Sequence, residues 1–305
     1  LGEGEHITAM LQVDLEALRQ QAPEGDDGDD IEGVIVEQEE VEESGEDEDG
    51  DDAEGSDEPT GAYIFMATAK GTVKKTPLVQ FSRPRSSGLI ALRLDEGDTL
   101  IAAAVTDGAR EVMMFSDGGK VIRFKESKVR TMGRTARGVR GMRLPEGQLI
   151  ISMLIPEADA QILTASARGY GKRTAMAEFP RRGRGGQGVI AMVSNERNGA
   201  LVGAVQVLDG EEIMLISDQG TLVRTRVDEV SSLGRNTQGV TLIKLASDET
   251  LVGLERVQEP SEVEGEELDV EALEGDDLTE VEAGDGVLVE QVDVADANEQ
   301  VAGDE

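Results

Sequence analysis

The sequence contains no cysteine and no tryptophan, and its aromatic residues are limited to two tyrosines and five phenylalanines. Without cysteine the chain can form neither disulfides nor thiolate metal sites, which fits a protein of the reducing cytoplasm. His6 is the single histidine, so the sequence argues against a zinc site and against a histidine general base. The scarcity of aromatic residues also argues against binding to single-stranded nucleic acid, because such proteins stack the bases on aromatic side chains.

Several patterns of enzymes and membrane proteins are missing as well. No run approaches eighteen apolar residues, so we expect no membrane-spanning helix. The segment RGYGKR around Gly169 falls in a predicted hairpin turn, whereas a nucleotide-binding P-loop precedes a helix. The acidic segments lack the glycine-punctuated spacing of a calcium-binding loop. We therefore expect no catalytic residue, no metal site and no cofactor in this chain.

Charge divides the chain into acidic and basic parts. The sequence has 29 lysines and arginines against 64 aspartates and glutamates, which gives a net charge of −35. Residues 23–60 and 258–305 contain 20 and 19 of these acids, and neither segment contains a lysine or arginine. Residues 61–257 hold 28 basic and 21 acidic residues, so this part carries a net charge of +7. A nucleic acid is therefore a plausible partner of the basic part, although the summed charge would argue against one.

A block of about fifty residues occurs four times in the basic part. The copies begin at Tyr63, Glu111, Gln161 and Glu212. Each contains a turn glycine, at Gly71, Gly119, Gly169 and Gly220. Each contains a second glycine, at Gly88, Gly138, Gly188 and Gly239, with spacings of 50, 50 and 51 residues. So regular a repeat predicts an array of similar structural units.

Within one repeat the pattern indicates four short strands. An apolar run such as residues 213–217 is followed by Asp-Gln-Gly or Asp-Gly-Gly, whose glycine permits the positive φ of a tight hairpin turn. A returning strand follows, a third strand begins at the second glycine, and a fourth, such as QLIISML, ends the repeat. Four strands per repeat are typical of a propeller blade. We therefore expect an all-β fold with four blades, none of which buries both of its faces alone. The blades are expected at approximately residues 61–110, 111–160, 161–210 and 211–257.

The segments outside the four repeats suggest a fragment of a larger protein. Residues 1–11, LGEGEHITAML, resemble LPEGQLIISML at residues 144–154, so residues 1–22 are interpreted as the end of a preceding, truncated blade. The acidic insertion at 23–60 and the acidic C-terminal tail at 258–305 are predicted to be disordered from their Glu, Asp and Gly content. Two interpretations of these acidic segments stay open. They are either a tolerated insertion and a solubilising tail, or tethered polyanions that compete with DNA.

The repeats place cations at corresponding positions, four residues after the turn glycine and again before the second glycine. Binding of duplex DNA through its phosphates needs cations on a rigid frame, and it is largely independent of sequence and strongly dependent on salt. The alternative is that these side chains are ordinary solvated surface charges. The predicted DNA-binding residues are Lys74, Lys75, Arg83, Arg85, Arg123, Lys125, Lys128, Arg130, Arg134, Arg137, Lys172, Arg173, Arg181, Arg182, Arg184, Arg224, Arg226 and Arg235.

Several segments of the repeats resemble the C-terminal domain of the A subunit of bacterial DNA gyrase. They are ATAKGTVKKT at 67–76, RFKESKVRTMG at 123–133, RGYGKRTAMAEFP at 168–180 and TLVRTRVDEVSSLGRNTQGV at 221–240. The resemblance implies a β-pinwheel, a propeller-like fold whose blades exchange strands with their neighbours and around whose basic rim a DNA duplex wraps. Domains of this type usually have six blades, which would make these the last four.

The family carries a seven-residue box, QRRGGKG, on its first blade, and that blade is not in this sequence. RRGRGGQG at residues 181–188 looks like a degenerate copy of the box. Arg184, Gly185, Gly186 and Gly188 match the box, and Gln187 replaces its lysine. Glycines would let the backbone approach phosphates that the arginines neutralise. The alternative is a flexible basic loop between blades.

The resemblance also implies how such a domain acts. Wrapped DNA would be presented to the gate of the enzyme, so that ATP-driven strand passage introduces negative supercoils. The catalytic tyrosine, the ATPase and its Mg²⁺ would belong to other domains of the gyrase A₂B₂ heterotetramer, namely the rest of its A subunit, or its B subunit. Tyr63 and Tyr170 fall in a predicted strand and a turn, and they are not interpreted as nucleophiles. No membrane partner is expected, and the protein is expected to be cytoplasmic.

Two other functions remain open at this stage. The equivalent domain of the A subunit of topoisomerase IV would use fewer blades and a weakened or absent box. A propeller-like scaffold for protein interactions would carry its basic rim incidentally. Binding of DNA that weakens with salt would separate the scaffold from the other two.

Overall fold

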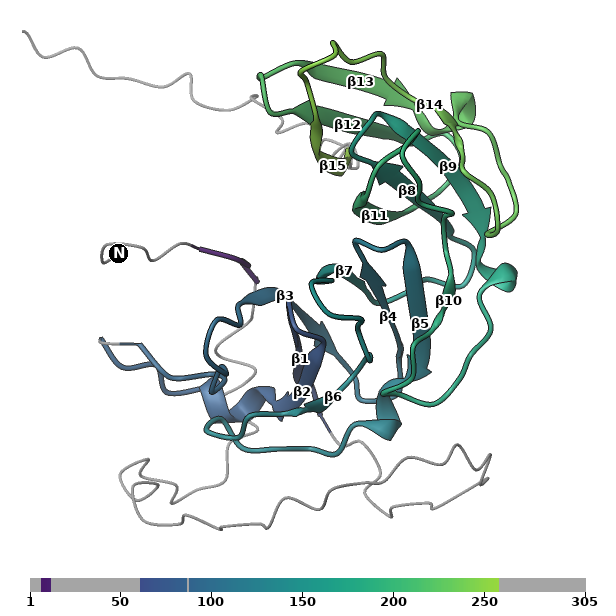
Figure 1. The fold of residues 1–305 in the computed structure, drawn as a ribbon. Helices are drawn as coiled ribbons and strands as arrows, with labels where there is room; N and C mark the ends of the chain where they lie inside the picture. Colours follow the sequence, from purple (N-terminus) through teal and green to yellow (C-terminus); the bar gives the residue numbers. More distant parts are fainter. Residues whose placement is uncertain (1–6, 12–60, 87, 258–305) are drawn as a thin grey trace, which may run out of the picture. The chain divides into compact units, whose positions relative to one another are not determined.

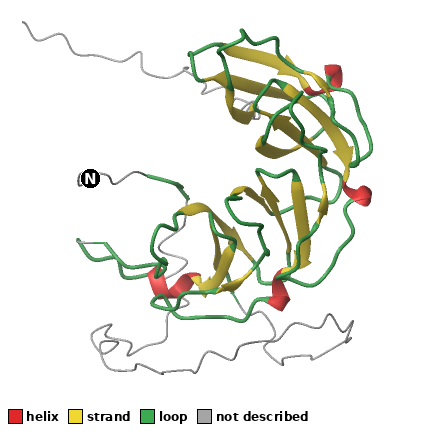
Figure 2. Cartoon of the chain, viewed as in Figure 1, coloured by secondary structure: helices red, strands yellow, loops and turns green. Residues whose placement is uncertain are grey.

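The computed structural model describes residues 7–11, 61–86 and 88–257. Regular structure in this part of the chain is β-strand throughout, apart from four short 3₁₀ turns (Figure 1, Figure 2). None of these turns has the length or hydropathy of a membrane-spanning helix. The all-β prediction is therefore confirmed. The predictions of disorder for 23–60 and 258–305 lie outside the described residues.

Every repeat begins with an antiparallel hairpin. The first strands are β1 (Tyr63–Thr68), β4 (Glu111–Ser116), β8 (Gln161–Ser166) and β12 (Glu212–Ser217). The returning strands are β2 (Thr72–Pro77), β5 (Lys120–Lys125), β9 (Tyr170–Ala175) and β13 (Leu222–Arg226). A 3₁₀ turn follows each hairpin, namely η1 (Leu78–Phe81), η2 (Glu126–Lys128), η3 (Met176–Glu178) and η4 (Val227–Glu229).

The third and fourth strands of the repeats pair with different partners. The fourth strands, β3 (Leu100–Thr106), β7 (Ile150–Leu154), β11 (Leu201–Val207) and β15 (Leu251–Val257), pair with the first strand of their own repeat. The third strands are β6 (Val139–Arg140), β10 (Val189–Ile190) and β14 (Val240–Thr241), and each pairs with the returning strand of the preceding repeat. This exchange of strands between neighbouring sheets is the arrangement implied by the β-pinwheel resemblance.

The recurring glycines mark where one repeat touches the next. Gly119 in the second hairpin turn has φ +78°, and a Cβ there would lie 2.3 Å from the carbonyl oxygen of Met192 in the third repeat. The amides of Ala191 and Met192 donate to the carbonyl of Gly119 (2.8 and 3.1 Å). Gly188 precedes β10 with φ +69°, and its Cβ would lie 2.2 Å from the carbonyl oxygen of Val121. Both positions need glycine because the crossing chain lies directly against the neighbouring hairpin.

The hydrophobic core lies between successive sheets, because the inner hairpins are buried on both faces. Val112 and Met114 of β4 pack in a cluster with residues of the first repeat, whereas Met113 and Phe115 pack in a cluster with residues of the third. The Phe115 ring contacts that of Phe179 edge to face, with centroids 6.4 Å apart. Each sheet thus stabilises the next, as expected for blades that cannot bury both faces alone.

Two predictions of strands need correction. The first three sheets have four strands, but the fourth has three, in the order β13-β12-β15, because no described residue pairs with the outer edge of β13. The segment that begins at Gly88, expected to be a third strand, forms no strand. A strand of this type needs the returning strand of a preceding sheet, and no such sheet exists among the described residues.

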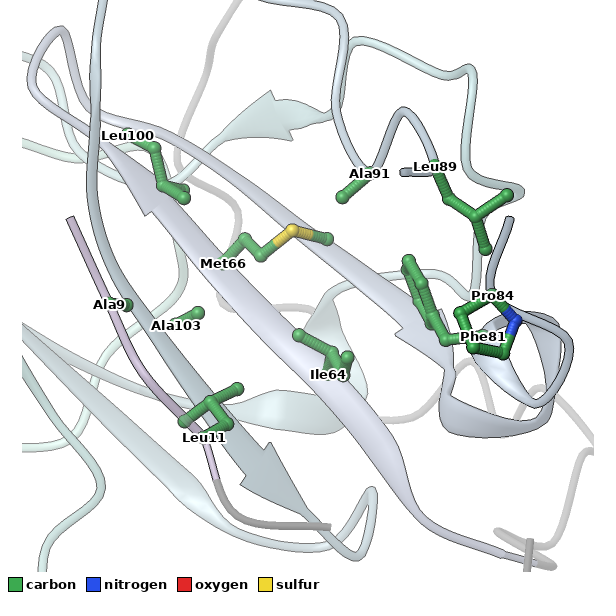
Figure 3. A pocket seen from close by; sticks show the side chains of 10 residues that line it. All are labelled: Ala9, Leu11, Ile64, Met66, Phe81, Pro84, Leu89, Ala91, Leu100 and Ala103. Atoms are coloured by element: carbon green, nitrogen blue, oxygen red, sulfur yellow. The ribbon is translucent and has the colours of Figure 1, made fainter. Parts of the chain in front are cut away.

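Residues 7–11 lie beside the first sheet (Figure 3). Ala9 and Leu11 line an apolar pocket of about 340 Å³ together with Leu100 and Ala103 of β3. Residues 7–11 form no strand, because no described first strand pairs with them. The interpretation of residues 1–22 as the end of a preceding blade stays a prediction, since most of that segment lies outside the described residues. The described residues that line the pocket are all apolar.

Candidate nucleic-acid interface

Three loops connect the 3₁₀ turns to the third strands, and together they contain seven arginines and no acidic residue. We call them crossing loops 1, 2 and 3, at residues 129–138, 179–188 and 230–239. Each leaves its own hairpin and ends beside the returning strand of the preceding repeat, where its third strand pairs. All three contain the sequence Gly-Arg at the same point, with Arg134, Arg184 and Arg235 half-buried. Strand exchange therefore brings cations of successive repeats together.

Lys74 and Lys172 were predicted to bind DNA, but the structure gives them another role. Both side chains are fully buried, with 0 % of their surface exposed. The Lys172 ammonium donates to the carbonyls of Gly234 (2.7 Å) and Arg235 (2.6 Å). The prediction failed because each of these two returning strands is covered on both faces, so that neither lysine reaches solvent. Neither ammonium is accessible to a phosphate.

Arg123 and Arg173 connect neighbouring repeats, and Lys75 is buried against its own repeat, which differs from the predicted contact with DNA. Lys75 is 6 % exposed, and its ammonium lies 5.1 Å from the centre of the Tyr63 ring. Arg123 donates from Nη1 to the carbonyls of Met176 and Phe179 (3.1 Å each). Arg173 donates from Nε to the carbonyl of Val230 (2.8 Å). The guanidinium groups of Arg123 and Arg173 are therefore engaged between repeats, and the Lys75 ammonium is engaged within the first repeat.

Arg123 also takes part in a small charged cluster across two repeats. Its Nη2 lies 2.5 Å from Oε2 of Glu111, and Nη1 of Arg181 lies 3.0 Å from Oε1 of the same carboxylate. Burial of Glu111 raises its pKa, but hydrogen bonds from the two arginines outweigh this effect and hold the pKa below its usual value. One carboxylate therefore neutralises part of the charge that the sequence assigned to DNA.

Crossing loop 2 lies over the second repeat and brings the exposed cations of both repeats together. The Arg182 amide donates to the carbonyl of Arg123 (2.8 Å), and Arg184 Nε donates to the carbonyl of Lys128 (2.9 Å). Lys125, at the end of β5, and Lys128 and Arg130 just after it are exposed, as is Arg182. None of these four forms an ion pair with another residue that the structure describes. We call Lys125, Lys128, Arg130 and Arg182 the central cation cluster.

The remaining predicted cations lie outside this cluster. Arg137 is exposed and lies 3.3 Å from the carboxylate of Asp95, and Arg224 and Arg226 pair with Glu212. Arg83 and Arg85 are exposed in the first repeat. These five arginines are therefore distributed over the first, second and fourth repeats and do not form one cluster.

The loop that resembles the gyrase box is fixed by hydrogen bonds to the preceding repeat. The Gly185 amide donates to the carbonyl of Gly141 (2.7 Å), and Gly186 accepts from the Arg143 amide (2.9 Å). Arg184 Nη1 donates to the carbonyl of Arg140 (3.3 Å), and Gln187 accepts from Lys120 Nζ (3.3 Å). These bonds explain Arg184 and Gly185 through contacts between blades, and the close approach to Val121 explains Gly188 in the same way. Any part that the loop plays with DNA stays a prediction.

Sequence reasoning missed cations beside this loop. Arg140 and Arg143 are exposed and lie next to it through their backbone bonds, but they follow the second glycine instead of preceding it. The repeat of Gly-Arg at residues 133–134, 183–184 and 234–235 was a further signal. Aligning the repeats on that dipeptide would have identified the crossing loops directly.

The buried lysines should make the free energy of unfolding depend on pH. Burial, opposed by Glu178, lowers the pKa of Lys172 from 10.5 to about 8. Between pH 8 and 10.5 the unfolded chain binds more protons, so the folded state gains stability as the pH rises through this window. Relative to Lys172→Met, the natural protein should gain about 2 kcal/mol from pH 7 to pH 9.5. Urea unfolding at both pH values measures this gain. A difference between the proteins that does not change with pH would mean that the carbonyl bonds keep the pKa near 10.5.

Comparison with known proteins places this geometry in a family. A sequence model described as the DNA gyrase C-terminal domain, a β-propeller, matches residues 62–107, 110–157, 160–207 and 211–258. The DNA gyrase A subunit of Pseudomonas aeruginosa is 74% identical over 269 residues, which cover 88% of this chain and 29% of the relative. The corresponding subunit of Escherichia coli K12 is 56% identical over 218 residues, which cover 71% of this chain and 25% of the relative. The chain thus spans less than a third of the length of these relatives.

Solved structures give the same architecture. A crystal structure of the C-terminal domain of DNA topoisomerase IV aligns with a TM-score of 0.62 and 27% identity, over 67% of this chain and 64% of the other. A structure of the DNA gyrase A C-terminal domain aligns with a TM-score of 0.59 and 28% identity, over 65% of this chain and 67% of the other. The propeller-like fold predicted from the repeats is confirmed.

Proposed function

Because this chain belongs to the family of DNA gyrase C-terminal domains, we propose that its basic repeats bind duplex DNA through the phosphates and wrap it. The observation that carries the proposal is the central cation cluster. Four exposed cations from two repeats meet there on backbone that hydrogen bonds hold in place, and no described carboxylate neutralises them. Such a surface suits the regular phosphates of a duplex and would read no particular sequence.

In the complete enzyme, this wrapping would support ATP-dependent negative supercoiling by a type II topoisomerase. The domain would contribute geometry and no chemistry, since bending a duplex costs several kcal/mol that many phosphate contacts can offset. The catalytic residues, ATP and Mg²⁺ would belong to the remainder of the A subunit, or to the B subunit, which are the partners of this domain in the cytoplasm.

The proposal is tested with the full 305-residue chain and a long linear duplex across a series of salt concentrations. We expect tight binding at low salt and an affinity that falls steeply as salt increases. Relaxed circles closed by ligase in the presence of the protein should show a changed linking number, because wrapped DNA is closed in a bent path. Weak binding that does not depend on salt would favour a scaffold for protein interactions.

The structural match to the C-terminal domain of topoisomerase IV keeps that enzyme as a second candidate. The 74% identity to a gyrase A subunit favours gyrase. The chain can be incorporated into a complete A subunit, combined with the B subunit, in an ATP-dependent supercoiling assay that separates the two. Relaxation without supercoiling would indicate the topoisomerase IV type.

A further inference from the structure

The third residue after the turn glycine, in the returning strand, is a lysine in two repeats and an aliphatic residue in the other two. Lys74 and Lys172 occupy this position in the first and third repeats, whereas Ile122 and Val223 occupy it in the second and fourth. Lys74, Ile122 and Lys172 are all buried. Burial of an ammonium costs free energy unless hydrogen bonds compensate, and the aliphatic residues show that the fold does not require a lysine here. The two lysines therefore call for an explanation beyond packing.

Lys172 is bonded to the crossing loop of the next repeat. Its ammonium donates to the carbonyls of Gly234 (2.7 Å) and Arg235 (2.6 Å) and to Oγ1 of Thr237 (3.1 Å). The Thr237 hydroxyl in turn donates to the Gly234 carbonyl (2.9 Å). Three bonds from one buried group to three residues of crossing loop 3 fix the backbone on both sides of Arg235.

Lys74 makes the same kind of connection between the first and second repeats. Its ammonium donates to the carbonyls of Ala91 (2.7 Å) and Arg134. Arg134 holds the place in crossing loop 1 that Arg235 holds in crossing loop 3. A buried lysine is thus bonded to the backbone of the arginine in the Gly-Arg dipeptide in both cases.

Crossing loop 2 has no lysine beneath it and is held differently. A Cβ on Gly186 would lie 4.0 Å from Cδ1 of Ile122, so the loop packs on an apolar side chain at this position. Its backbone is fixed by the Gly185 amide bonded to Gly141 and by the Arg143 amide bonded to Gly186. Crossing loop 3 has an equivalent main-chain bond, from the Val193 amide to the Thr237 carbonyl (2.9 Å), in addition to the bonds from Lys172. The buried ammonium is therefore what distinguishes crossing loops 1 and 3 from crossing loop 2.

We propose that Lys74 and Lys172 are positioning residues for DNA binding. Each holds the crossing loop of the following repeat in the conformation that presents Arg134 or Arg235 to a phosphate. Arg235 Nη1 donates to the Ile190 carbonyl (3.3 Å), and the other N–H groups of this half-buried guanidinium are the ones assigned to the phosphate. This inference rests on the proposed function. Because both lysines are buried, they act on DNA through the arginine whose backbone they hold.

A double-mutant cycle in the full chain tests the inference with a linear duplex at low salt. Arg235→Ala should weaken binding about threefold and reduce the steepness of the salt dependence by about one phosphate contact. Lys172→Ile, which introduces the residue found at this position in the second repeat, should have the same effect. The double variant should bind no worse than either single variant, because the lysine acts only through Arg235. Lys244→Ile removes one positive charge elsewhere in the fourth repeat and measures the effect of charge alone.

The outcomes distinguish the inference from the proposed function. Additive losses, or a loss in Lys172→Ile no larger than in Lys244→Ile, overturn the inference while leaving DNA binding intact. A full chain that does not bind duplex DNA overturns both. Thermal unfolding checks that each variant is folded. If Lys172→Ile is not folded, the independent cycle of Lys74→Ile with Arg134→Ala distinguishes additive from non-additive losses in the same way.

Discussion

Gly188→Ala is expected to destabilise the folded protein by roughly 3 kcal/mol, from the positive φ and from a clash with the neighbouring strand. The residue has φ +69°, which costs a non-glycine residue about 1–2 kcal/mol. The new Cβ would also lie 2.2 Å from the carbonyl oxygen of Val121 and 3.1 Å from the amide nitrogen of Ile122. Both atoms belong to paired backbone and cannot rotate away, so the crossing loop has to shift. Urea unfolding followed by circular dichroism measures the loss.

Gly147→Ala is the matched control for this prediction. Gly147 has φ +79°, but nothing lies within 4 Å of the place its Cβ would occupy. The Gly147→Ala variant should lose only about 1 kcal/mol of folding stability, which is the cost of a positive φ. Equal losses of stability in the two variants would show that the contact between repeats is not rigid. The positive φ would then be the only reason for a glycine at position 188.

The glycine spacing of the sequence predicted the repeat and the hairpin turns, but not the second reason for those glycines. A turn glycine is explained locally by its positive φ, so nothing in the pattern of Gly119 indicates that Met192 of the next repeat lies against it. Strand exchange was likewise expected from the family resemblance and not from the pattern. Alternation of apolar residues shows which side chains share a face, but it does not identify the strand that pairs with the edge.

Burial is the reason that the candidate site was only partly predictable. Charged residues are mostly exposed, so the sequence alone favoured Lys74 and Lys172 as surface cations. Their burial depends on the crossing loop of another repeat, about sixty residues away in sequence. The central cation cluster was predicted residue by residue, but its assembly from two repeats was not. That assembly follows from the pairing of β10 with β5.

The joint replacement of Lys125, Lys128, Arg130 and Arg182 by alanine is expected to reduce the affinity for a linear duplex by on the order of a hundredfold at moderate salt. Each phosphate contact that the variant lacks should lower the slope of log affinity against log salt by about 0.9, so four such contacts should lower it by about 3.6. The four side chains are exposed, and the bond that holds crossing loop 2 at Arg182 comes from its backbone amide. Folding should therefore be preserved, which thermal unfolding checks.

A second variant with the same loss of charge decides whether position or net charge causes this effect. Lys70, Arg110, Arg168 and Lys244 are exposed and lie outside the crossing loops, so their joint replacement by alanine removes four positive charges from other parts of the repeats. Because phosphate contacts act over a short range in moderate salt, this control should keep most of the affinity and most of the salt slope. If both quadruple variants lose affinity equally, DNA responds to the charge of the whole basic part, and the path assigned to the duplex over crossing loop 2 is wrong. If only the variant of the central cation cluster loses affinity, the duplex passes where strand exchange brings the second and third repeats together.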